Sequence, residues 1–338
     1  MARVRVAVIM GGRSSEHDIS VASARSVVDA LDPERYDVRA VEIGQDGRWQ
    51  LGATEQAELG EGGQNLPVPA DGSSSPFEGV DVVFPVLHGP FGEDGTVQGF
   101  LELADVAYVG AGVTASALCM DKDLFKAVMR DKGVPVANSV TVLDRHRDRA
   151  ENPFGYPVVV KPARLGSSVG ISIVREPAAL ADAIDLALEH DEKILLEEHI
   201  DGVEVECSVL GNEEPIASIP GEIVPLTSDW YDFSAKYDEG GMELVIPPRL
   251  DERTIARVQE LAVAAFVASD CEGMARVDFF VRENGEVVVN ELNTIPGFTA
   301  TSVYAKLFEA SGISYAELLD RLVELALERR DRRARLKY

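Results

Sequence analysis

MARVDFFVRENGEVVVNELN, residues 274–293, contains two apolar runs that predict neighbouring β-strands. Residues 283–285, Glu-Asn-Gly, separate the runs, and Asn-Gly at such a place indicates a hairpin. Residues two apart on a strand face the same side, so Glu291 and Asn293 share a face, and Asp278 can lie opposite them. Two carboxylates and an amide oxygen suit Mg²⁺, which also binds phosphate oxygens. The alternative is a solvated polar face, but acids within such apolar strands are costly to bury without a cation.

A loop rich in glycine and serine lies upstream of these strands. Residues 166–170 read GSSVG, and Lys161 closes the preceding apolar run YPVVVKP. Such a loop lets backbone amides converge on an anion; it lacks the Walker A spacing and is also compatible with a plain hairpin turn. Lys122 and Lys126 lie in a predicted helix, where a solvated lysine is the ordinary alternative. With the metal candidates, these features predict a site for a nucleoside triphosphate.

The first third of the chain alternates predicted strands and helices. Apolar runs indicate strands at 4–10, 36–43 and 80–87, and helical spacing indicates helices at 19–31 and 96–103. This alternation predicts a doubly wound parallel sheet, with ligands beyond the carboxyl ends of its strands.

The remaining two thirds predict a mixture of α/β and α+β structure. One helix is expected over 114–132, followed by a block of strands and one helix that ends near residue 200. The last third predicts further strands, the hairpin and helices at 252–268 and 314–330. At about 150 residues per domain, the length predicts two or three domains, and the block that ends near residue 200 is expected to be a small subdomain of its own.

Composition excludes several classes of protein. The 338 residues include 32 Lys and Arg against 58 Asp and Glu, a formal net charge of −26, which argues against nucleic acid or an anionic membrane as partner. Cys119, Cys207 and Cys271 are too few and too widely spaced for a disulfide framework or a zinc site. No apolar run approaches the ~18 residues of a membrane span. We expect a soluble, cytoplasmic protein whose partners are small molecules.

Seven strings, taken in order, resemble those of D-alanine–D-alanine ligases of the ATP-grasp superfamily. The resemblance runs from Val4 to about Leu327 and implies three domains, with ATP held between the central and C-terminal ones. These would be 1–110 on the substrate side, 111–200 with the Gly/Ser loop, and 201–338 with the lid loop and the metal candidates. The resemblance further implies ATP-dependent joining of two D-alanines through D-alanyl phosphate, for peptidoglycan precursors. The strings are HGPFGEDGTVQG (88–99), ASALCMDK (115–122), VVVKPARLGSSVGISIV (158–174), LLEEHIDGVEVECSVL (195–210), YDFSAKY (231–237), MARVDFF (274–280) and NELNTIPGFTATSVY (290–304).

The resemblance also implies roles for individual residues. Two Mg²⁺ ions, or Mn²⁺, would be held by Asp278, Glu291 and Asn293. ATP would be contacted by Lys122, Lys161, Ser167, Ser168, Glu197, Glu198, Ile200, Glu204, Lys236, Phe280 and Asn290. The amino acid substrates would be contacted by Glu16, His88, Lys236, Arg276, Ser302 and Val303. Catalysis would involve Glu16, Ser167, Tyr237, Arg276 and Gly297, with Arg276 and the Gly297 N–H stabilising the oxyanion. A lid over 227–242, a homodimer and a monovalent cation are further expectations of this kind.

Other functions remain open at this point. One is an ATP-grasp ligase for another pair of substrates, although Tyr237 in YDFSAKY favours an amine over a hydroxy acid as the second. Another is a regulatory protein that binds a nucleotide without turnover. A dehydrogenase would need NAD at Gly11-Gly12, where the GxGxxG fingerprint is absent.

Overall fold

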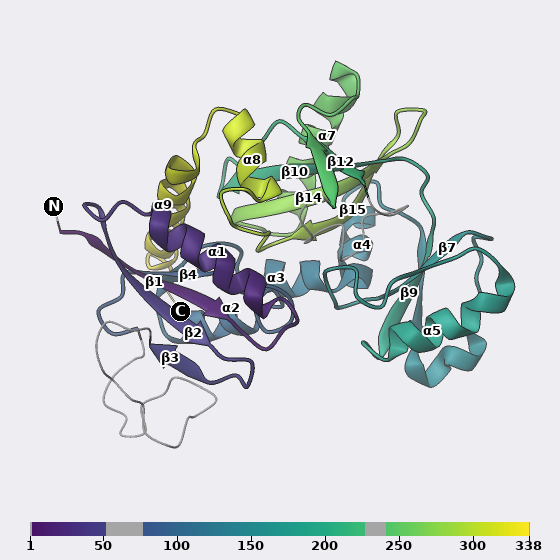
Figure 1. The fold of residues 1–338 in the computed structure, drawn as a ribbon, viewed down its shortest axis with the longest axis horizontal. Helices are drawn as coiled ribbons and strands as arrows, with labels where there is room; N and C mark the ends of the chain where they lie inside the picture. Colours follow the sequence, from purple (N-terminus) through teal and green to yellow (C-terminus); the bar gives the residue numbers. More distant parts are fainter. Residues whose placement is uncertain (1, 52–76, 227–240, 338) are drawn as a thin grey trace.

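Three β-sheets of different topology organise the chain in the computed structural model, which describes residues 2–51, 77–226 and 241–337 (Figure 1). The first sheet belongs to the N-terminal third. The second stands apart on the side of α5, and the third lies between them. No helix in the described part of the chain combines the length and apolar character needed to cross a bilayer.

The N-terminal sheet has the order β3-β2-β1-β4-β5 and is parallel except for β3, so the doubly wound topology is as predicted. β1 is buried over its last six residues because α1 and α2 cover the sheet, and such strands read as continuous apolar runs. The elements are β1 (Val4–Gly11), α1 (His17–Ala30), β2 (Tyr36–Ile43), β3 (Trp49–Leu51), β4 (Val82–Pro85), α2 (Thr96–Leu103) and β5 (Ala107–Tyr108).

The central sheet is antiparallel, with the order β6-β9-β7-β8 and a core of its own. Alternate apolar residues such as Val158 and Val160 on β7 pack against Ile184 of α5. The elements are β6 (Ser139–Leu143), η1 (Asp144–Arg149), β7 (Val158–Pro162), β8 (Ser172–Val174), η2 (Pro177–Ala179), α5 (Leu180–Leu188) and β9 (Lys193–Glu198).

The C-terminal sheet has the order β13-β12-β10-β14-β15, with β11 paired to β10. α7 covers one of its faces, where Val277, Phe279 and Phe266 share an apolar core. The alternate residues of β10 and β14 therefore face the other side. The elements are β10 (Val203–Gly211), β11 (Ile216–Ala217), β12 (Gly221–Pro225), β13 (Met242–Val245), α7 (Glu252–Ala268), β14 (Gly273–Val281) and β15 (Val287–Asn293).

The single helix predicted over 114–132 is wrong, because the structure has two helices, α3 (Val113–Met120) and α4 (Lys122–Asp131). Asp121 adopts an extended conformation between them and caps α4 by accepting a hydrogen bond from the Leu124 N–H (3.2 Å). Both helices pack on the C-terminal sheet, α3 through residues such as Cys119 and α4 through residues such as Phe125. The break makes Lys122 the first residue of α4.

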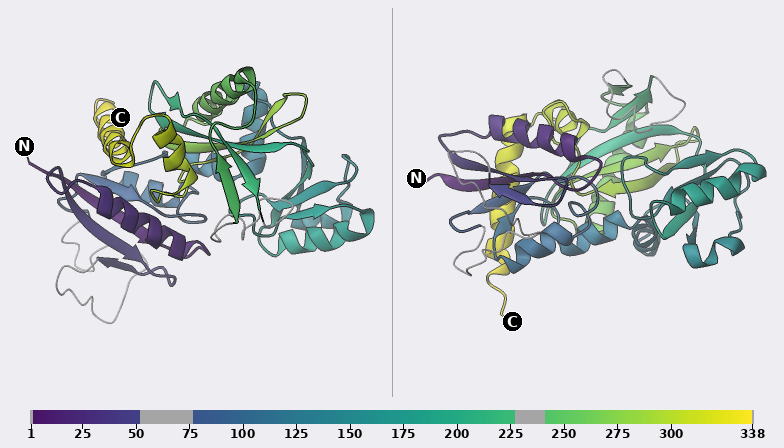
Figure 2. Two further views of the ribbon diagram at one scale, coloured as in Figure 1. Left: turned by 45° about the horizontal axis from the view of Figure 1, so that its top comes forward. Right: turned by 60° about the horizontal axis from the view of Figure 1, so that its bottom comes forward.

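The last two helices join the N-terminal and C-terminal sheets. α8 (Val303–Ala310) and α9 (Tyr315–Arg333) contribute to an apolar core shared with β1, β4 and α1. Figure 2 shows these helices, in yellow, beside the N-terminal sheet in both views. At the end of α9, buried Arg329 donates to the carbonyls of Tyr108 (2.7 Å) and Gly110.

Candidate active site

Two cavities, each of about 350 Å³, meet at the Gly/Ser loop. The first, here called the lysine cavity, lies between the central and C-terminal sheets and is lined by Lys122, Lys161 and Glu204 among others. The second, here called the arginine cavity, is lined by Glu16, Arg276 and Ser302 among others. Gly166, Ser167 and Glu291 line both. A ligand in one cavity can therefore reach a ligand in the other.

The floor of the lysine cavity is a buried cluster of three charges. Glu197 on β9 pairs with Lys161 on β7 (2.7 Å) and with Lys126 on α4 (2.8 Å), and all three side chains are at most 5% exposed. Burial by itself raises the pKa of Glu197, but the two ammonium groups outweigh it and lower that pKa to about 2. Burial lowers the pKa of Lys126 to about 8 despite Glu197. The cluster therefore presents net positive charge, which suits phosphate.

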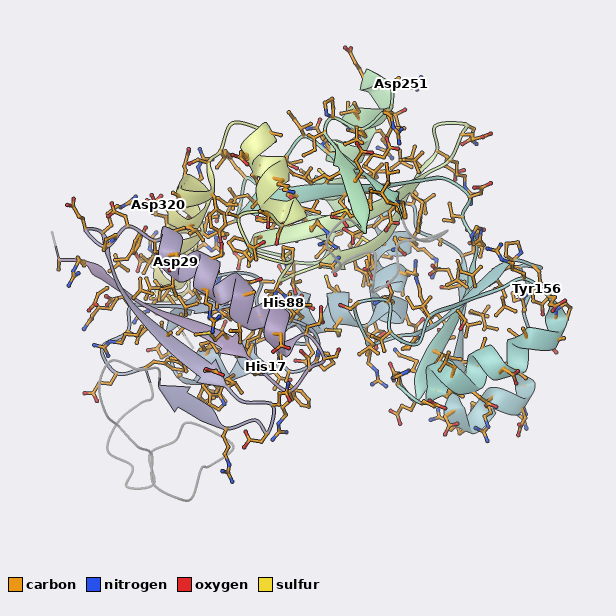
Figure 3. All side chains as sticks on the ribbon, viewed as in Figure 1. His17, Asp29, His88, Tyr156, Asp251 and Asp320 are labelled. Atoms are coloured by element: carbon orange, nitrogen blue, oxygen red, sulfur yellow. The ribbon has the colours of Figure 1, made fainter. Side chains whose placement is uncertain are left out.

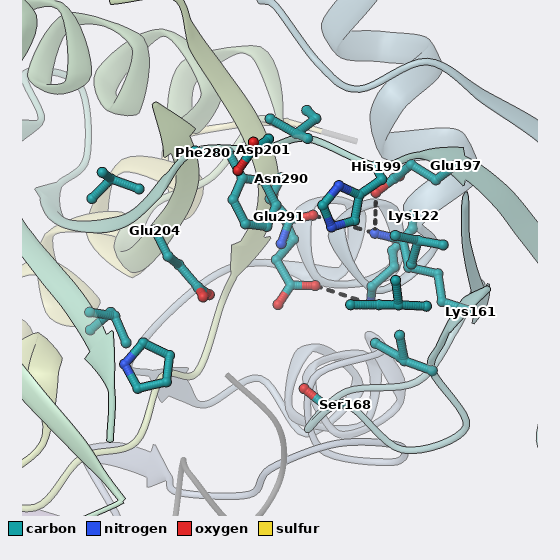
Figure 4. Close-up of a pocket in the computed structure, with 18 of the residues that line it drawn as sticks. Lys122, Lys161, Ser168, Glu197, His199, Asp201, Glu204, Phe280, Asn290 and Glu291 are labelled. Atoms are coloured by element: carbon teal, nitrogen blue, oxygen red, sulfur yellow. Dashed lines mark hydrogen bonds and ion pairs between the residues drawn. The ribbon is translucent and has the colours of Figure 1, made fainter. Parts of the chain in front are cut away.

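The third lysine comes from the start of α4. Lys122 Nζ donates to the Leu165 carbonyl (2.8 Å) and pairs with Glu291 (3.2 Å), while its backbone N–H donates to Ala163 (3.0 Å). Figure 4 shows Lys122 and Lys161 on one side of the cavity, with Glu204 opposite. The helix break at Asp121 thus fixes Lys122 against the loop that connects β7 with β8.

A β-bulge on β15 decides which residues reach the cavities. Asp278 pairs with Glu291 and Phe279 with Val289, so Asn290 is an extra residue between them. In a regular strand Glu291 would face the same side as Val287 and Val289, which are buried in the apolar core. The extra residue reverses the alternation, so that Asn290 and Glu291 both line the lysine cavity.

The far wall of the lysine cavity combines apolar faces with carboxylates. Ile200 and Phe280 belong to one small apolar cluster. Glu198 accepts hydrogen bonds from Asn138 N (2.9 Å) and Nδ2 (3.0 Å), and Glu204 lies opposite Phe280 on the neighbouring strand. A flat apolar slot flanked by acceptors suits a purine and the hydroxyls of a ribose. Of the eleven residues expected at ATP, ten line this cavity, and Lys236 lies outside the described residues.

The three expected metal ligands lie together on the β14–β15 hairpin. Asp278 pairs with Glu291 in register, and Asn293 Nδ2 donates to Asp278 Oδ2 (2.9 Å). Arg276 holds the Asp278 carboxylate by two hydrogen bonds, from Nε to Oδ1 (2.7 Å) and from NH2 to Oδ2 (2.8 Å). Asp278 lines neither cavity because Arg276 and Asn293 cover it, whereas Glu291 lines both. The donors are all oxygens on one face, which fits a hard divalent cation.

The arginine cavity joins the N-terminal third of the chain to the Gly/Ser loop. Glu16 precedes α1, and its Oε1 accepts a hydrogen bond from the Ser167 hydroxyl (2.5 Å). The loop that connects antiparallel β7 and β8 runs from residue 163 to 171, too long for a two-residue hairpin turn. Within it Ser167 and Ser168 both have positive φ, 53° and 59°, so the loop makes a left-handed turn at these serines. The turn brings Ser167 across to Glu16.

Two titratable groups next to Glu16 have shifted pKa values. His88 is buried, and burial lowers its pKa although Glu16 opposes the shift; its Nδ1 bonds the Ile295 carbonyl (3.0 Å). Within the described part of the chain, His88 Nε2 has no hydrogen-bond partner. Burial, and then the carboxylate of Glu16, raise the pKa of Glu93 to about 8. Figure 3 labels His17 and His88 at the end of α1 nearer the centre of the molecule and Asp29 at the other end.

The remaining wall of the arginine cavity is the start of α8. Gly297, Ser302 and Val303 line it. Ser302 Oγ accepts from the Thr299 N–H (3.0 Å), and a Cβ on Gly297 would lie only 3.3 Å from that oxygen. Of the residues expected to be catalytic or to contact substrate, Tyr237 and Lys236 lie outside the described residues. The structure brings all the others together around the arginine cavity.

Sequence reasoning missed two residues of this region, Glu93 and Glu206, and left the role of a third, Lys126, open. The solvated alternative is wrong for Lys126, which is fully buried. Its position four residues after Lys122 on one helix face was the available signal. Glu93 was present in HGPFGEDG but not singled out, and Glu206, which pairs with Arg276 (2.9 Å), has no local signal.

Comparisons with known proteins agree over nearly the whole chain. The family model described as D-ala D-ala ligase N-terminus matches residues 5–111, and the one described as D-ala D-ala ligase C-terminus matches 128–324. A D-alanine–D-alanine ligase of Chloroherpeton thalassium is 46% identical over 97% of this chain and 98% of its own. One from a Thermoanaerobacter species is 45% identical over 99% of both chains.

Two solved structures of ligases are also similar to this chain over nearly its whole length. The structure of the D-alanine–D-alanine ligase from Coxiella burnetii has a TM-score of 0.81 and 36% identity, covering 99% of this chain and 97% of its own. That of the VanG D-Ala:D-Ser ligase from Enterococcus faecalis has a TM-score of 0.82, also with 36% identity, covering 96% and 100%.

Proposed function

The chain belongs to the D-alanine–D-alanine ligase family and has its three-domain ATP-grasp architecture, and on this premise we propose how its residues join two D-alanines with ATP. It is an ATP-dependent ligase of cell-wall precursor synthesis. One observation carries the assignment of roles: the lysine and arginine cavities meet at Ser167 and Glu291. A nucleotide in the first cavity then presents its terminal phosphate to a carboxylate in the second.

ATP binds in the lysine cavity. Lys122 and Lys161 neutralise phosphate charge, Ser167 and Ser168 bring the loop to the phosphates, and Glu204 accepts from the ribose. Ile200 and Phe280 border the adenine, with Glu197, Glu198 and Asn290 completing the wall. By the family resemblance alone, Lys236 would contact ATP and substrate, and Tyr237 would take part in catalysis.

A divalent cation fits the oxygen donors of the hairpin. Asp278, Glu291 and Asn293 would hold two Mg²⁺ ions, or Mn²⁺, after Arg276 releases part of Asp278 and Lys122 releases Glu291 for the phosphates. When bound, the cation neutralises charge on the phosphates during transfer. A monovalent cation is also part of the proposal, and it rests on the family resemblance alone.

The first D-alanine lies in the arginine cavity. Glu16 binds its ammonium group, and His88 lies beside Glu16. A carboxylate oxygen attacks the terminal phosphorus, so that the bond to the bridging oxygen breaks and ADP leaves D-alanyl phosphate behind. Phosphorylation removes the charge that protects the carboxyl carbon from nucleophiles.

The second D-alanine then attacks this carbon with its neutral amine. Ser302 and Val303 hold its carboxylate at the start of α8. Arg276 and the Gly297 N–H stabilise the oxyanion of the tetrahedral intermediate, and loss of one such donor typically costs about 2.7–4 kcal/mol in the barrier. The carbon–oxygen bond to phosphate breaks, giving the dipeptide and inorganic phosphate.

The product identifies the function. We expect D-alanyl-D-alanine, ADP and phosphate in equal amounts from ATP, Mg²⁺ and D-alanine, measured by mass spectrometry and phosphate release. Reactions with L-alanine, D-serine and D-lactate are the controls for the substrate pair. Preferred formation of a mixed product would assign a different pair, and binding of ATP without phosphate release would point to a regulatory protein. We also propose that the enzyme is a homodimer and lies in the cytoplasm. Size-exclusion chromatography tests the first expectation, and fractionation of the cell tests the second.

A further inference from the structure

Two carboxylates from neighbouring strands hold the guanidinium of Arg276. Asp278 lies two residues further along β14, and Glu206 lies directly opposite Asp278 on β10. Arg276 Nε is 2.7 Å from Asp278 Oδ1 and 2.9 Å from Glu206 Oε2. The Glu206 side chain is 1% exposed and that of Arg276 is 15% exposed. One cation is thus shared by two buried acids.

Asp278 and Glu206 differ in their other neighbours. Asp278 also accepts from Asn293 and pairs in register with Glu291, so it belongs to the expected cation site. Glu206 lines neither cavity, so it does not touch a ligand in either of them. Arg276 itself lines the arginine cavity. Glu206 can therefore act on the reaction through its ion pair with Arg276.

We propose that Glu206 is a positioning residue that keeps Arg276 at the arginine cavity when a divalent cation binds Asp278. This inference rests on the proposed function of Asp278 and Arg276. A cation at Asp278 repels the neighbouring guanidinium and competes with it for carboxylate oxygens. Glu206 supplies the second anchor and keeps the charge of Arg276 compensated in a site of low exposure. Without it, Arg276 loses one of the two carboxylates with which it pairs, so cation binding at Asp278 and the placement of Arg276 compete more strongly.

The test variant is Glu206→Gln, which keeps the shape and removes the charge. We expect Mn²⁺ to bind about tenfold more weakly in the presence of ADP, measured by electron paramagnetic resonance, since about 1.4 kcal/mol corresponds to that factor. We also expect kcat with D-alanine to fall about tenfold or more at saturating Mg²⁺, while KM for ATP changes less than twofold. Glu272→Gln, which removes a carboxylate paired with Arg332 outside both cavities, should leave Mn²⁺ affinity and kcat unchanged.

Saturating Mg²⁺ separates positioning from a simple loss of negative charge. If Glu206 only attracted the cation, saturation would restore kcat; if it positions Arg276, the loss of kcat persists. Wild-type values of Mn²⁺ affinity and kcat in the variant, or full restoration by Mg²⁺, would overturn the inference. Glu206→Asp keeps the charge with a shorter reach and should show a smaller fall in kcat, which keeps the test valid if the glutamine variant folds poorly. Failure of the wild-type enzyme to release phosphate with D-alanine would instead refute the proposed function.

Discussion

The side chain of Glu93 keeps its proton near neutral pH because of its position. Burial raises its pKa and the Glu16 carboxylate raises it further, while the hydrogen bond from the Gly89 N–H (3.0 Å) and the charge of Arg276 oppose the shift. A neutral acid can stand next to Glu16 without repelling it. The cavity that is expected to receive an ammonium group thus contains one negative charge there instead of two.

This protonation predicts a pH-dependent stability. The pKa of Glu93 is about 8 in the folded protein, against an ordinary value of 4.5, so the folded state binds this proton more tightly. Its contribution is fully present below about pH 4.5 and is lost as the pH rises towards about 8. Glu93→Gln lacks this loss, so its stability relative to the wild type should increase by about 1–3 kcal/mol between pH 5 and 8. Urea denaturation at several pH values measures it, and parallel curves for the two proteins would contradict it.

Lys126 shows where sequence reasoning stops at the residue scale. Its neighbours on α4 indicate only an amphipathic helix, and a lysine in such a helix is ordinarily solvated. The partner that buries it, Glu197, lies on β9 of another sheet. Local sequence contains no signal for such a long-range pair.

Replacing Lys126 with Met should destabilise the protein strongly. The variant leaves Glu197 with Lys161 alone, and breaking a buried ion pair typically costs about 3–5 kcal/mol. Lys161 is then drawn towards Glu197, so KM for ATP should rise as well. Lys132→Met, at the exposed end of the same helix, is the matched control. Equal stability of the two variants in urea would show that the cluster makes no net contribution.

At the scale of elements, the helices and strands with a plain periodic pattern were predictable. The predicted bounds 36–43, 96–103 and 252–268 coincide with β2, α2 and α7. The break between α3 and α4 was missed because apolar spacing continues through it. The bulge at Asn290 was missed because strand alternation alone cannot locate an extra residue.

Asp121 is the capping residue by which α4 presents Lys122. Asp121→Ala removes the cap, worth about 1 kcal/mol, together with the ion pair to Lys193. Because Lys122 follows directly, KM for ATP should rise severalfold. Asp251→Ala removes the equivalent cap of α7, which accepts from the Thr254 N–H (2.8 Å) outside both cavities. That control should lose similar stability and keep KM for ATP, so an unchanged KM in both variants would refute the placement of Lys122 by the cap.

At the scale of the whole molecule, the N-terminal and C-terminal sheets are held together by α8, α9 and their shared core. The helix predicted over 314–330 corresponds to α9, and α8 was not predicted. The pattern of a helix does not tell which sheet it covers, because any apolar face would serve. The relative placement of Glu16 and Arg276 depends on this packing. It was therefore accessible only through the resemblance and the structure.

Arg329→Met tests this junction. The buried guanidinium donates to the carbonyl of Tyr108, at the end of β5, and to that of Gly110, and its loss leaves both without that donor. Since a buried unsatisfied group costs about 1–3 kcal/mol, we expect the free energy of unfolding to fall by about 2 kcal/mol or more. Arg330→Met, an exposed neighbour on α9, should change it by less than about 0.5 kcal/mol. Chemical denaturation of both variants decides the matter.

The hydrogen bond between Ser167 and Glu16 connects the phosphate-side loop with the N-terminal third of the chain. An ammonium group that binds Glu16 competes with the Ser167 hydroxyl for the same carboxylate. Occupancy of either site therefore alters the affinity of the other, and thermodynamic reciprocity makes the two effects equal. We therefore expect this one contact to couple binding of phosphate at the Gly/Ser loop to binding of the ammonium group at Glu16.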